Sequence, residues 1–312
     1  MDLDRLGVHE STSIDFPFEV LAAELADDVP EVVPVGGSDG VDPATCDAFV
    51  TFTHQPALLD ADPVWIHTTQ AGVDGFPFDA YESRDIPLTN SAGLHGDSVG
   101  ETAIGMCFAL GRRLHQFARQ QTRREWSFPE WDAAFTLRGE PVTVVGLGTI
   151  GSAVAERADA LGMTVTGVRR SDDPVPGVET LVSPDRLHDA IRDARFVVLA
   201  VPLTDETEGL VGPSAFDAMR EDAYLVNVAR GPVVDQDALV EALEAGEIAG
   251  AALDVFEEEP LSEDSPLWGM DDVIVTPHAA VADREFYVRV ADRVRENVER
   301  LRTGRSLENR VV

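Results

Sequence analysis

Short apolar runs alternate with segments of helical periodicity through the middle of the chain. Helix-period segments near residues 150–161, 184–193, 213–219 and 237–245 separate the first five of these runs. Each run is continuous rather than alternating, which is typical of strands covered on both faces of a parallel sheet. The pattern therefore predicts a doubly wound parallel α/β domain. Its predicted strands are Val142–Gly146, Thr164–Val168, Phe196–Ala200, Tyr224–Val228, Ala249–Leu253 and Val273–Val275.

The first hundred residues predict a second, smaller α/β unit, with strands at Ala48–Thr53 and Val64–Thr68. Ser98 and Glu101 have the spacing of a capping box, so we expect Ser98 to open a long helix and Glu101 to cap it. Apolar residues recur at helical spacing over Asp283–Leu301, and we expect this final helix to pack on the first unit. The predicted division is a discontinuous domain, residues 1–98 completed by 284–312, around a second domain of residues 99–283.

The chain is strongly acidic, which excludes several classes of partner. It carries 57 Asp+Glu against 24 Lys+Arg, a net charge of −33, and every basic residue is Arg. A field this negative repels phosphate backbones and anionic membranes, so we expect no nucleic-acid partner and no membrane partner. The self-repulsion is largely screened at molar salt, where the Debye length is about 3 Å. The composition resembles that of haloarchaeal proteins and predicts a halophilic protein.

The cysteines and most histidines give no sign of a metal site. Cys46 and Cys107 are far apart and outside any CxxC spacing, so we expect two buried apolar side chains. The histidines outside the motifs described below lack the spacing of metal ligands. The chain shows no signal-peptide pattern and no apolar run near the ~18 residues of a membrane span. We therefore expect a cytoplasmic protein without a metal.

A glycine-rich turn is the first candidate for chemistry. Gly146–Gly151 has the pattern GxGxxG, follows a predicted strand and opens a predicted helix. The first glycine allows the tight turn, the second lets the backbone approach a pyrophosphate, and the third lets the helix pack closely on the strand. The helix N-terminus then faces the anionic phosphates. This context predicts a dinucleotide-binding site.

The corner after the next strand indicates which dinucleotide is bound. NAD sites place an acidic residue about 20 positions on, where it accepts hydrogen bonds from the ribose hydroxyls. Here the corresponding stretch holds Arg169, Arg170 and Ser171 instead. Two guanidinium groups and a hydroxyl suit a 2′-phosphate, which a carboxylate would repel. The sequence therefore predicts NADP(H) as the preferred cofactor, with NAD(H) bound more weakly.

Five further motifs, in order and at characteristic spacing, carry a family resemblance. They extend from about residue 45 to the C-terminus, and together they closely resemble the D-isomer-specific 2-hydroxyacid dehydrogenase family. This resemblance implies a Rossmann-type doubly wound cofactor domain and a smaller flavodoxin-like α/β substrate domain. It also implies a homodimer formed through the cofactor domains. The motifs are Ala71–Asp74, Val201–Thr207, Asn227–Asp235, Asp254–Leu261 and Thr276–Ala280.

The resemblance assigns roles to individual positions. The catalytic residues of the family correspond to Arg230, Glu259 and His278, and its substrate-binding residues to Gly72, Val73 and Arg230. Asp254 corresponds to the residue that bonds the nicotinamide carboxamide. With the glycine turn and the arginine corner, the expected cofactor-binding residues are Gly146, Gly148, Thr149, Ile150, Gly151, Arg169, Arg170, Ser171, Val201, Pro202, Thr207, Val228, Ala229, Asp254, His278 and Ala280.

The chemistry of a 2-oxo acid reduction needs these residue types. Hydride attack places negative charge on the carbonyl oxygen, which Arg230 can stabilise while it orients the carboxylate. His278 is the expected general acid, and Glu259 favours its charged form by Coulomb attraction. The predicted activity is an NADP(H)-dependent D-2-hydroxyacid dehydrogenase acting on small 2-oxo acids.

Three alternatives remain open at this point. The enzyme could be a glyoxylate/hydroxypyruvate reductase or a phosphoglycerate dehydrogenase of the same family. It could also be a nucleotide-sensing, non-catalytic binding protein on the same fold, because such relatives keep a similar triad.

An aromatic segment before the glycine turn is suited to a dimer arm but equally to an intradomain core. Its residues are Trp126, Phe128, Trp131 and Phe135.

Overall fold

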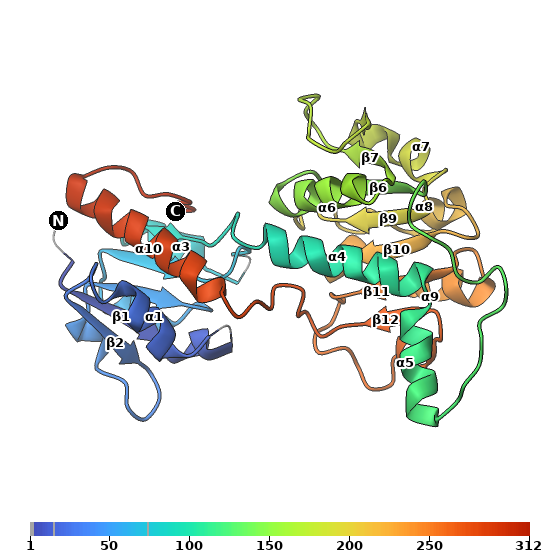
Figure 1. Cartoon of the computed structure of the whole chain (residues 1–312). Coiled ribbons are helices and arrows are strands. Elements are labelled where there is room, and N and C mark those ends of the chain that lie inside the picture. The colour runs from blue at the N-terminus through green and yellow to red at the C-terminus, as the bar shows by residue number, and fades with distance from the viewer. Residues whose placement is uncertain (1–2, 15, 74) are drawn as a thin grey trace. The chain divides into compact units, whose positions relative to one another are not determined.

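The chain folds into two compact units (Figure 1). The structure, a computed structural model, describes residues 3–14, 16–73 and 75–312. Unit 1 combines Met1–His95 with Ala282–Val312, and unit 2 is Gly96–Val281. Each unit has its own parallel sheet and its own hydrophobic core, and each is described by itself below.

Unit 2 contains a seven-stranded sheet in the order β12-β11-β10-β9-β6-β7-β8, in which every pair is parallel. Counted from β6, this is the strand order of the Rossmann fold with one strand added beyond the sixth. The predicted fold class is confirmed, and all six predicted strands are present. The strands are β6 (Pro141–Val145), β7 (Thr164–Val168), β8 (Thr180–Val182), β9 (Phe196–Leu199), β10 (Tyr224–Asn227), β11 (Gly250–Leu253) and β12 (Val273–Val275).

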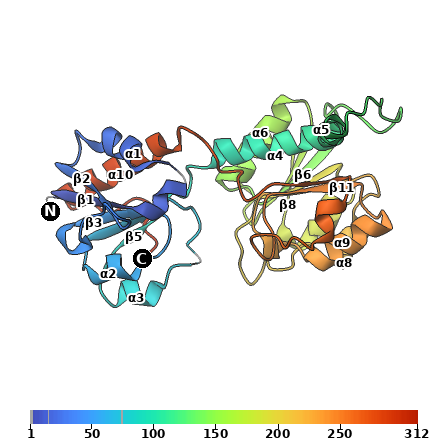
Figure 2. The ribbon, with the colours of Figure 1, turned by 90° about the horizontal axis from the view of Figure 1, so that it is seen from below.

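Helices cover both faces of this sheet, which explains its continuous apolar strands. Successive residues enter different cores: Val144 and Val226 join one apolar cluster, whereas Val145 and Leu225 join the other. Figure 2 shows α4 and α6 on one side of the strands and α8 and α9 on the other. The helices of unit 2 are α4 (Gly96–Gly111), α5 (Leu114–Arg123), α6 (Thr149–Ala160), α7 (Leu187–Ile191), α8 (Pro213–Ala218) and α9 (Gln236–Ala245).

Unit 1 contains a five-stranded parallel sheet in the order β2-β1-β3-β4-β5, which is the flavodoxin-like order. The C-terminal helix α10 (Phe286–Thr303) packs on α1 and shares an apolar cluster with β1 and β3. Its buried residues recur at helical spacing along one face. The other elements are β1 (Arg5–His9), β2 (Glu31–Val35), β3 (Ala48–Thr51), β4 (Trp65–Thr68), β5 (Leu88–Thr89), α1 (Phe18–Leu25), α2 (Pro56–Asp60) and α3 (Phe78–Glu82).

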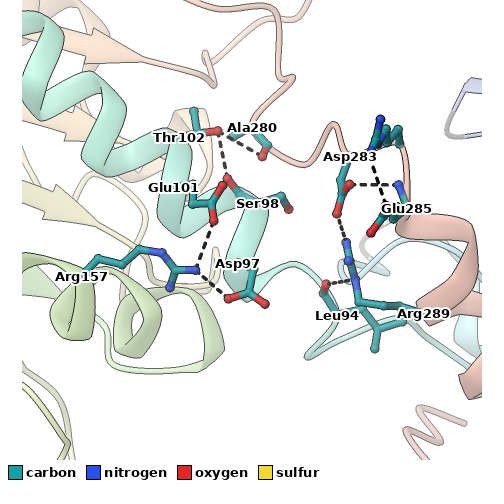
Figure 3. A network of polar contacts seen from close by, with 11 residues as sticks. Leu94, Asp97, Ser98, Glu101, Thr102, Arg157, Ala280, Asp283, Glu285 and Arg289 are labelled. Carbon is teal, nitrogen blue, oxygen red and sulfur yellow. Dashed lines mark hydrogen bonds and ion pairs between the residues drawn. The ribbon is translucent and has the colours of Figure 1, made fainter. Parts of the chain in front are cut away.

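The predicted capping box at the start of α4 is wrong. The helix begins at Gly96, so Ser98 lies inside its first turn rather than before it. The Glu101 carboxylate instead lies 3.6 Å from the Arg157 guanidinium on α6, and Asp97 lies 2.7 Å from the same group (Figure 3). The acidic residues at this end of α4 therefore join two helices that also pack closely at Gly100, opposite Ala153.

Two further predictions concern buried cysteines and membrane spans. Cys46 and Cys107 are buried and free, as expected. Among the helices of the described residues, none combines the length and the apolar character needed to cross a membrane.

A buried histidine lies in the core of unit 1, within a satisfied hydrogen-bond chain. Trp65 Nε1 donates to Thr89 Oγ1 at 2.8 Å, and His67 Nδ1 lies 2.8 Å from the same hydroxyl. His67 Nε2 lies 3.1 Å from Ser91 Oγ, which in turn donates to the Thr68 carbonyl. This order of donors suits the neutral ring, with its proton on Nε2. Burial, with a smaller contribution from Arg293, lowers the pKa of His67 to about 3.

We expect His67 to make folding stability depend on pH. Its folded-state pKa lies below the unfolded value of about 6.5, so the unfolded chain binds the proton first as pH falls. This group should lower the free energy of unfolding by about 2 kcal/mol between pH 7 and pH 5. Urea titrations at both pH values, in fixed KCl, measure the difference. His67→Asn should remove this part of the pH dependence, and the exposed control His188→Asn should keep it. Equal pH dependence in the parent and His67→Asn would contradict the assignment.

Candidate active site

The glycine turn has the geometry that a dinucleotide requires. Gly146 follows β6 with φ of 91°, and a Cβ there would lie 2.6 Å from the Ala200 carbonyl oxygen. A Cβ at Gly151 would lie 1.8 Å from the Gly146 carbonyl oxygen, so only glycine allows α6 to pack this closely on the turn. At Gly148, by contrast, a Cβ would meet nothing within 4 Å. Gly148 is also the N-cap of α6 and provides no side-chain cap. The open backbone at the start of α6 fits an anionic pyrophosphate.

The arginine corner lies at the carboxyl end of β7, the strand next to β6. The Arg169 N–H donates to the Val182 carbonyl at 3.1 Å, which fixes the backbone of the corner on β8. The Arg170 side chain is 86% exposed. The structure therefore brings Arg169, Arg170 and Ser171 to the strand end beside the glycine turn.

Two neighbouring loops carry five more of the residues predicted to bind the cofactor. Val201, Pro202 and Thr207 follow β9, and Thr207 Oγ1 donates to the Pro202 carbonyl at 2.6 Å and so closes a compact turn. Val228 and Ala229 follow β10 and are buried. Because β9 and β10 are adjacent, their loops lie at the same sheet edge as the glycine turn.

Asn227 shapes the loop that carries Arg230. It is buried, its Oδ1 accepts the Ala229 N–H at 3.0 Å, and its Nδ2 donates to the Arg230 carbonyl at 3.1 Å. Both bonds are local to the turn, so Asn227 holds the backbone on either side of the predicted cofactor and substrate contacts. Asn227 is not among the residues given a role from the sequence, although a polar residue at the end of an apolar strand is a signal that the sequence contains.

The Arg230 loop is in direct backbone contact with the loop that carries Glu259. A Cβ at Gly231 would lie 1.8 Å from the Phe256 carbonyl oxygen and 2.4 Å from the Glu257 nitrogen. Glu257 accepts the N–H of Gln236, the first residue of α9, at 3.0 Å. The loop that carries Glu259 therefore contacts the Arg230 loop at Gly231 and the start of α9 at Gln236.

Glu259 and His278 form a hydrogen-bonded pair. Glu259 Oε2 lies 2.8 Å from His278 Nδ1, and Glu259 Oε1 accepts the Phe256 N–H at 3.0 Å. The hydrogen bond from the Phe256 N–H orients the carboxylate toward the imidazole ring. Both side chains are partly exposed, at 42% for His278 and 37% for Glu259. Because Nδ1 faces the carboxylate, Nε2 is the ring nitrogen left to face a substrate.

Asp254 holds the loop that carries His278. It is 2% exposed, yet its Oδ1 accepts Thr276 Oγ1 at 2.6 Å and the Ala279 N–H at 2.9 Å. Its Oδ2 accepts the Ala280 N–H at 3.0 Å, and its carbonyl accepts the His278 N–H at 2.8 Å. Charge-assisted hydrogen bonds of this kind offset the free-energy cost of removing a carboxylate from water. This positioning role is not predictable from the sequence pattern, because the partners lie more than 20 residues away along the chain.

The predicted substrate-binding turn belongs to unit 1, whereas the other predicted site residues belong to unit 2. Gly72 and Val73 follow β4, and Asn90 Nδ2 holds the preceding Ala71 carbonyl at 2.7 Å. Val73 packs against an apolar cluster of the same unit. Asp74, the last residue of this motif, lies outside the described residues. In the part of the chain that the structure describes, no group of three or more His, Cys, Asp or Glu side chains is arranged to hold a metal ion.

Comparisons with known proteins agree with this architecture. Residues 104–280 match the family described as D-isomer specific 2-hydroxyacid dehydrogenase, NAD binding domain. A glyoxylate reductase from Korarchaeum cryptofilum is 35% identical over 271 residues, which cover 83% of this chain and 80% of that protein.

Two solved structures match over nearly the whole chain. A D-isomer specific 2-hydroxyacid dehydrogenase from Xanthobacter autotrophicus Py2, in complex with NADPH and MES, is 28% identical with a TM-score of 0.81, covering 99% of this chain and 98% of that one. A D-lactate dehydrogenase with NAD+ from Lactobacillus jensenii is 25% identical with a TM-score of 0.82, covering 99% of each chain. Because one neighbour is in complex with NADPH and the other with NAD+, the cofactor preference has to be argued from this chain's own residues.

Proposed function

The chain belongs to the D-isomer specific 2-hydroxyacid dehydrogenase family of oxidoreductases, and from this premise we propose that it is an NADP(H)-dependent reductase of small 2-oxo acids. The observation that carries the proposal is the 2.8 Å contact between Glu259 Oε2 and His278 Nδ1. The loop that carries Glu259 packs against the loop that carries Arg230. These are the acid, its charged partner and the guanidinium that the reduction of a 2-oxo acid needs. The similarity to a glyoxylate reductase supports glyoxylate as one such acid.

The proposed roles follow from charge development during reduction. When bound, the dinucleotide supplies the hydride. Arg230 binds the substrate carboxylate and the carbonyl oxygen, and the backbone N–H groups of Gly72 and Val73 bind the carboxylate as well. His278 donates a proton from Nε2 to the carbonyl oxygen and takes it back in the reverse direction. Glu259 stabilises the protonated ring through Nδ1.

The residues proposed to hold the cofactor lie at the carboxyl edge of the unit 2 sheet. The open backbone of Gly148 and the first turn of α6 bind the pyrophosphate, and Arg169, Arg170 and Ser171 bind the 2′-phosphate. The wall residues after β9 and β10 enclose the dinucleotide. Asp254 bonds the nicotinamide carboxamide while its other bonds keep the His278 loop in place.

The activity is tested with a panel of 2-oxo acids that includes glyoxylate, hydroxypyruvate and pyruvate, assayed with NADPH and NADH at molar KCl. We expect turnover near the usual ~10 s⁻¹ on at least one acid. His278→Ala should reduce this rate on the order of 10²–10⁴-fold. Rates below ~0.01 s⁻¹ on every acid would overturn the proposal and favour a nucleotide-sensing binding protein.

Glu259→Gln should shift the pH dependence of catalysis. The amide keeps a hydrogen bond to His278 but removes the Coulomb attraction for the charged ring. Reduction needs the protonated ring, so its rate should fall away at lower pH than in the parent enzyme. Oxidation needs the neutral ring, so its acidic limb should move down in pH too. Superimposable pH–rate profiles at one salt concentration would show that Glu259 does not act on His278.

Exchanging the arginine corner should change the cofactor preference. We expect the parent enzyme to have a higher kcat/KM with NADPH than with NADH. Arg169→Asp combined with Arg170→Ala should weaken NADPH tenfold or more, because each lost charge-assisted bond contributes roughly 1.5–3 kcal/mol. Equal kcat/KM values for both cofactors in the parent enzyme would contradict the assignment.

Three exposed aromatic residues support a homodimer through the cofactor domain. Trp126, Phe128 and Trp131 are each more than 90% exposed, whereas Phe135 is half-buried, stacks on Tyr224 and lies tilted against Phe196. An exposed aromatic group of this kind marks an interaction surface.

Sedimentation should give a dimer for the parent protein, and the double variant Trp126→Ser with Trp131→Ser should weaken dimerisation. The half-exposed control Trp268→Ser should not, and a monomeric parent would refute the proposal.

The acidic surface supports a halophilic protein. At a net charge of −33, self-repulsion acts over a Debye length of about 10 Å in 0.1 M salt and about 3 Å in 1 M salt. The melting temperature should therefore rise between 0.1 and 3 M KCl. A melting temperature unchanged over this range would assign the acidic surface another role.

A further inference from the structure

Each side chain proposed to bind the 2′-phosphate already faces an acceptor from the chain itself. Ser171 Oγ donates to Asp173 Oδ2 at 3.0 Å, and Arg169 Nη1 lies 3.5 Å from the Asp173 carbonyl. One residue thus receives both contacts. Asp173 lies two residues after Ser171, in the same loop.

A second carboxylate reaches the corner from another loop. Arg170 Nη1 lies 3.9 Å from Glu206 Oε2, and both side chains are at least 80% exposed. Glu206 lies in the turn after β9, where the Thr204 N–H donates to Thr207 Oγ1 at 2.8 Å. Since β6 lies between β7 and β9, this ion pair joins the loops on either side of the strand that ends in the glycine turn.

We propose that Asp173, assisted by Glu206, is a specificity-determining residue that weakens binding of the 2′-phosphate and so leaves NADH usable. The inference rests on the proposed function, because it assumes that Arg169, Arg170 and Ser171 bind this phosphate. A phosphate monoester carries close to two negative charges near pH 7, and it needs the Ser171 hydroxyl and the Arg170 guanidinium, which already face the carboxylates of Asp173 and Glu206. It must displace them, and their charge remains nearby after it has done so.

The same carboxylates have no such effect on NADH. The adenosine ribose of NADH carries hydroxyl groups in place of the phosphate, and a carboxylate such as Asp173 accepts hydrogen bonds from hydroxyls. Exposed ion pairs contribute little to folding, so these acidic residues can be changed without loss of the fold. The corner therefore holds two opposed preferences: its arginines and Ser171 favour NADPH, and Asp173 and Glu206 oppose that preference.

Binding of two adenosine fragments tests the proposal without catalysis. We use 2′,5′-ADP, which carries the 2′-phosphate, and 5′-AMP, which lacks it, with calorimetry at one fixed ionic strength. Asp173→Asn, which removes the charge, should tighten 2′,5′-ADP roughly 3- to 10-fold, the effect of one nearby charge on a doubly charged phosphate. Asp173→Ala should tighten it at least as much, because Ser171 then loses its acceptor. Glu206→Gln should act in the same direction by a smaller factor, and 5′-AMP affinity should not rise with any of these changes.

Asp172 provides a matched control, since it is the adjacent exposed carboxylate of the same loop. Asp172→Asn changes net charge as Asp173→Asn does and should alter 2′,5′-ADP affinity less than twofold. Equal tightening by both variants would mean that only net charge matters and would overturn the proposal. So would an unchanged or weaker affinity in Asp173→Asn.

Failure of the proposed cofactor preference gives a different result. If the parent does not prefer NADPH, the cofactor assignment is wrong, whatever the variants do. If the parent prefers NADPH and Asp173→Asn binds 2′,5′-ADP no more tightly, only the role of Asp173 is wrong. If 2′,5′-ADP binds neither the parent nor the variants, the cofactor assignment and the role of Asp173 are both wrong.

Discussion

Helices bury both faces of the seven-stranded sheet, and this burial decides where polar chemistry can lie. Val144 and Val145 are neighbours on β6, yet each enters a different apolar cluster. No position inside such a strand has water to solvate a charge, so charged side chains belong at the strand ends. Because the strands are parallel, their carboxyl ends share one edge. The glycine turn, the arginine corner, Arg230, Glu259 and His278 all follow strand ends at that edge.

One short segment after β11 joins the two neighbouring loops at this edge, those after β10 and β12. Asp254 binds the loop after β12, and the Phe256 carbonyl packs against Gly231 in the loop after β10. Glu257 accepts a backbone N–H at the start of α9, and Glu259 meets His278. Asp254, Glu257 and Glu259 thus have separate partners, so their presence together reflects structure as well as the acidic composition of the chain.

The proposed ligands are anions, although the protein carries a net charge of −33. Binding an anion then requires a local reversal of sign. The uncapped start of α6 provides backbone N–H groups, and Arg169 and Arg170 provide the cations of the corner. Several other arginines are paired with carboxylates, as Arg157 is with Asp97 and Arg113 with Asp272. Carboxylates approach the corner as well, so its affinity for a phosphate depends on a balance of nearby charges rather than on the arginines alone.

The sequence by itself determined the elements whose signal is local. A strand buried on both faces needs a continuous apolar run, and a turn under a pyrophosphate needs glycines at given positions, so six of the seven unit 2 strands and Gly146–Gly151 were predictable. The edge strand β8, whose residues are exposed or half-buried, was not predicted. Only the tertiary structure decided what depends on partners distant in the chain. The strand β2 contains Pro34, which lacks the N–H that an inner strand would need. The strand forms because it lies at the edge of the sheet, and its edge position is not visible in the sequence. The start of α4 at Gly96, and the bonds from Asp254 to a loop more than 20 residues away, arise from packing between segments that the chain order does not bring together.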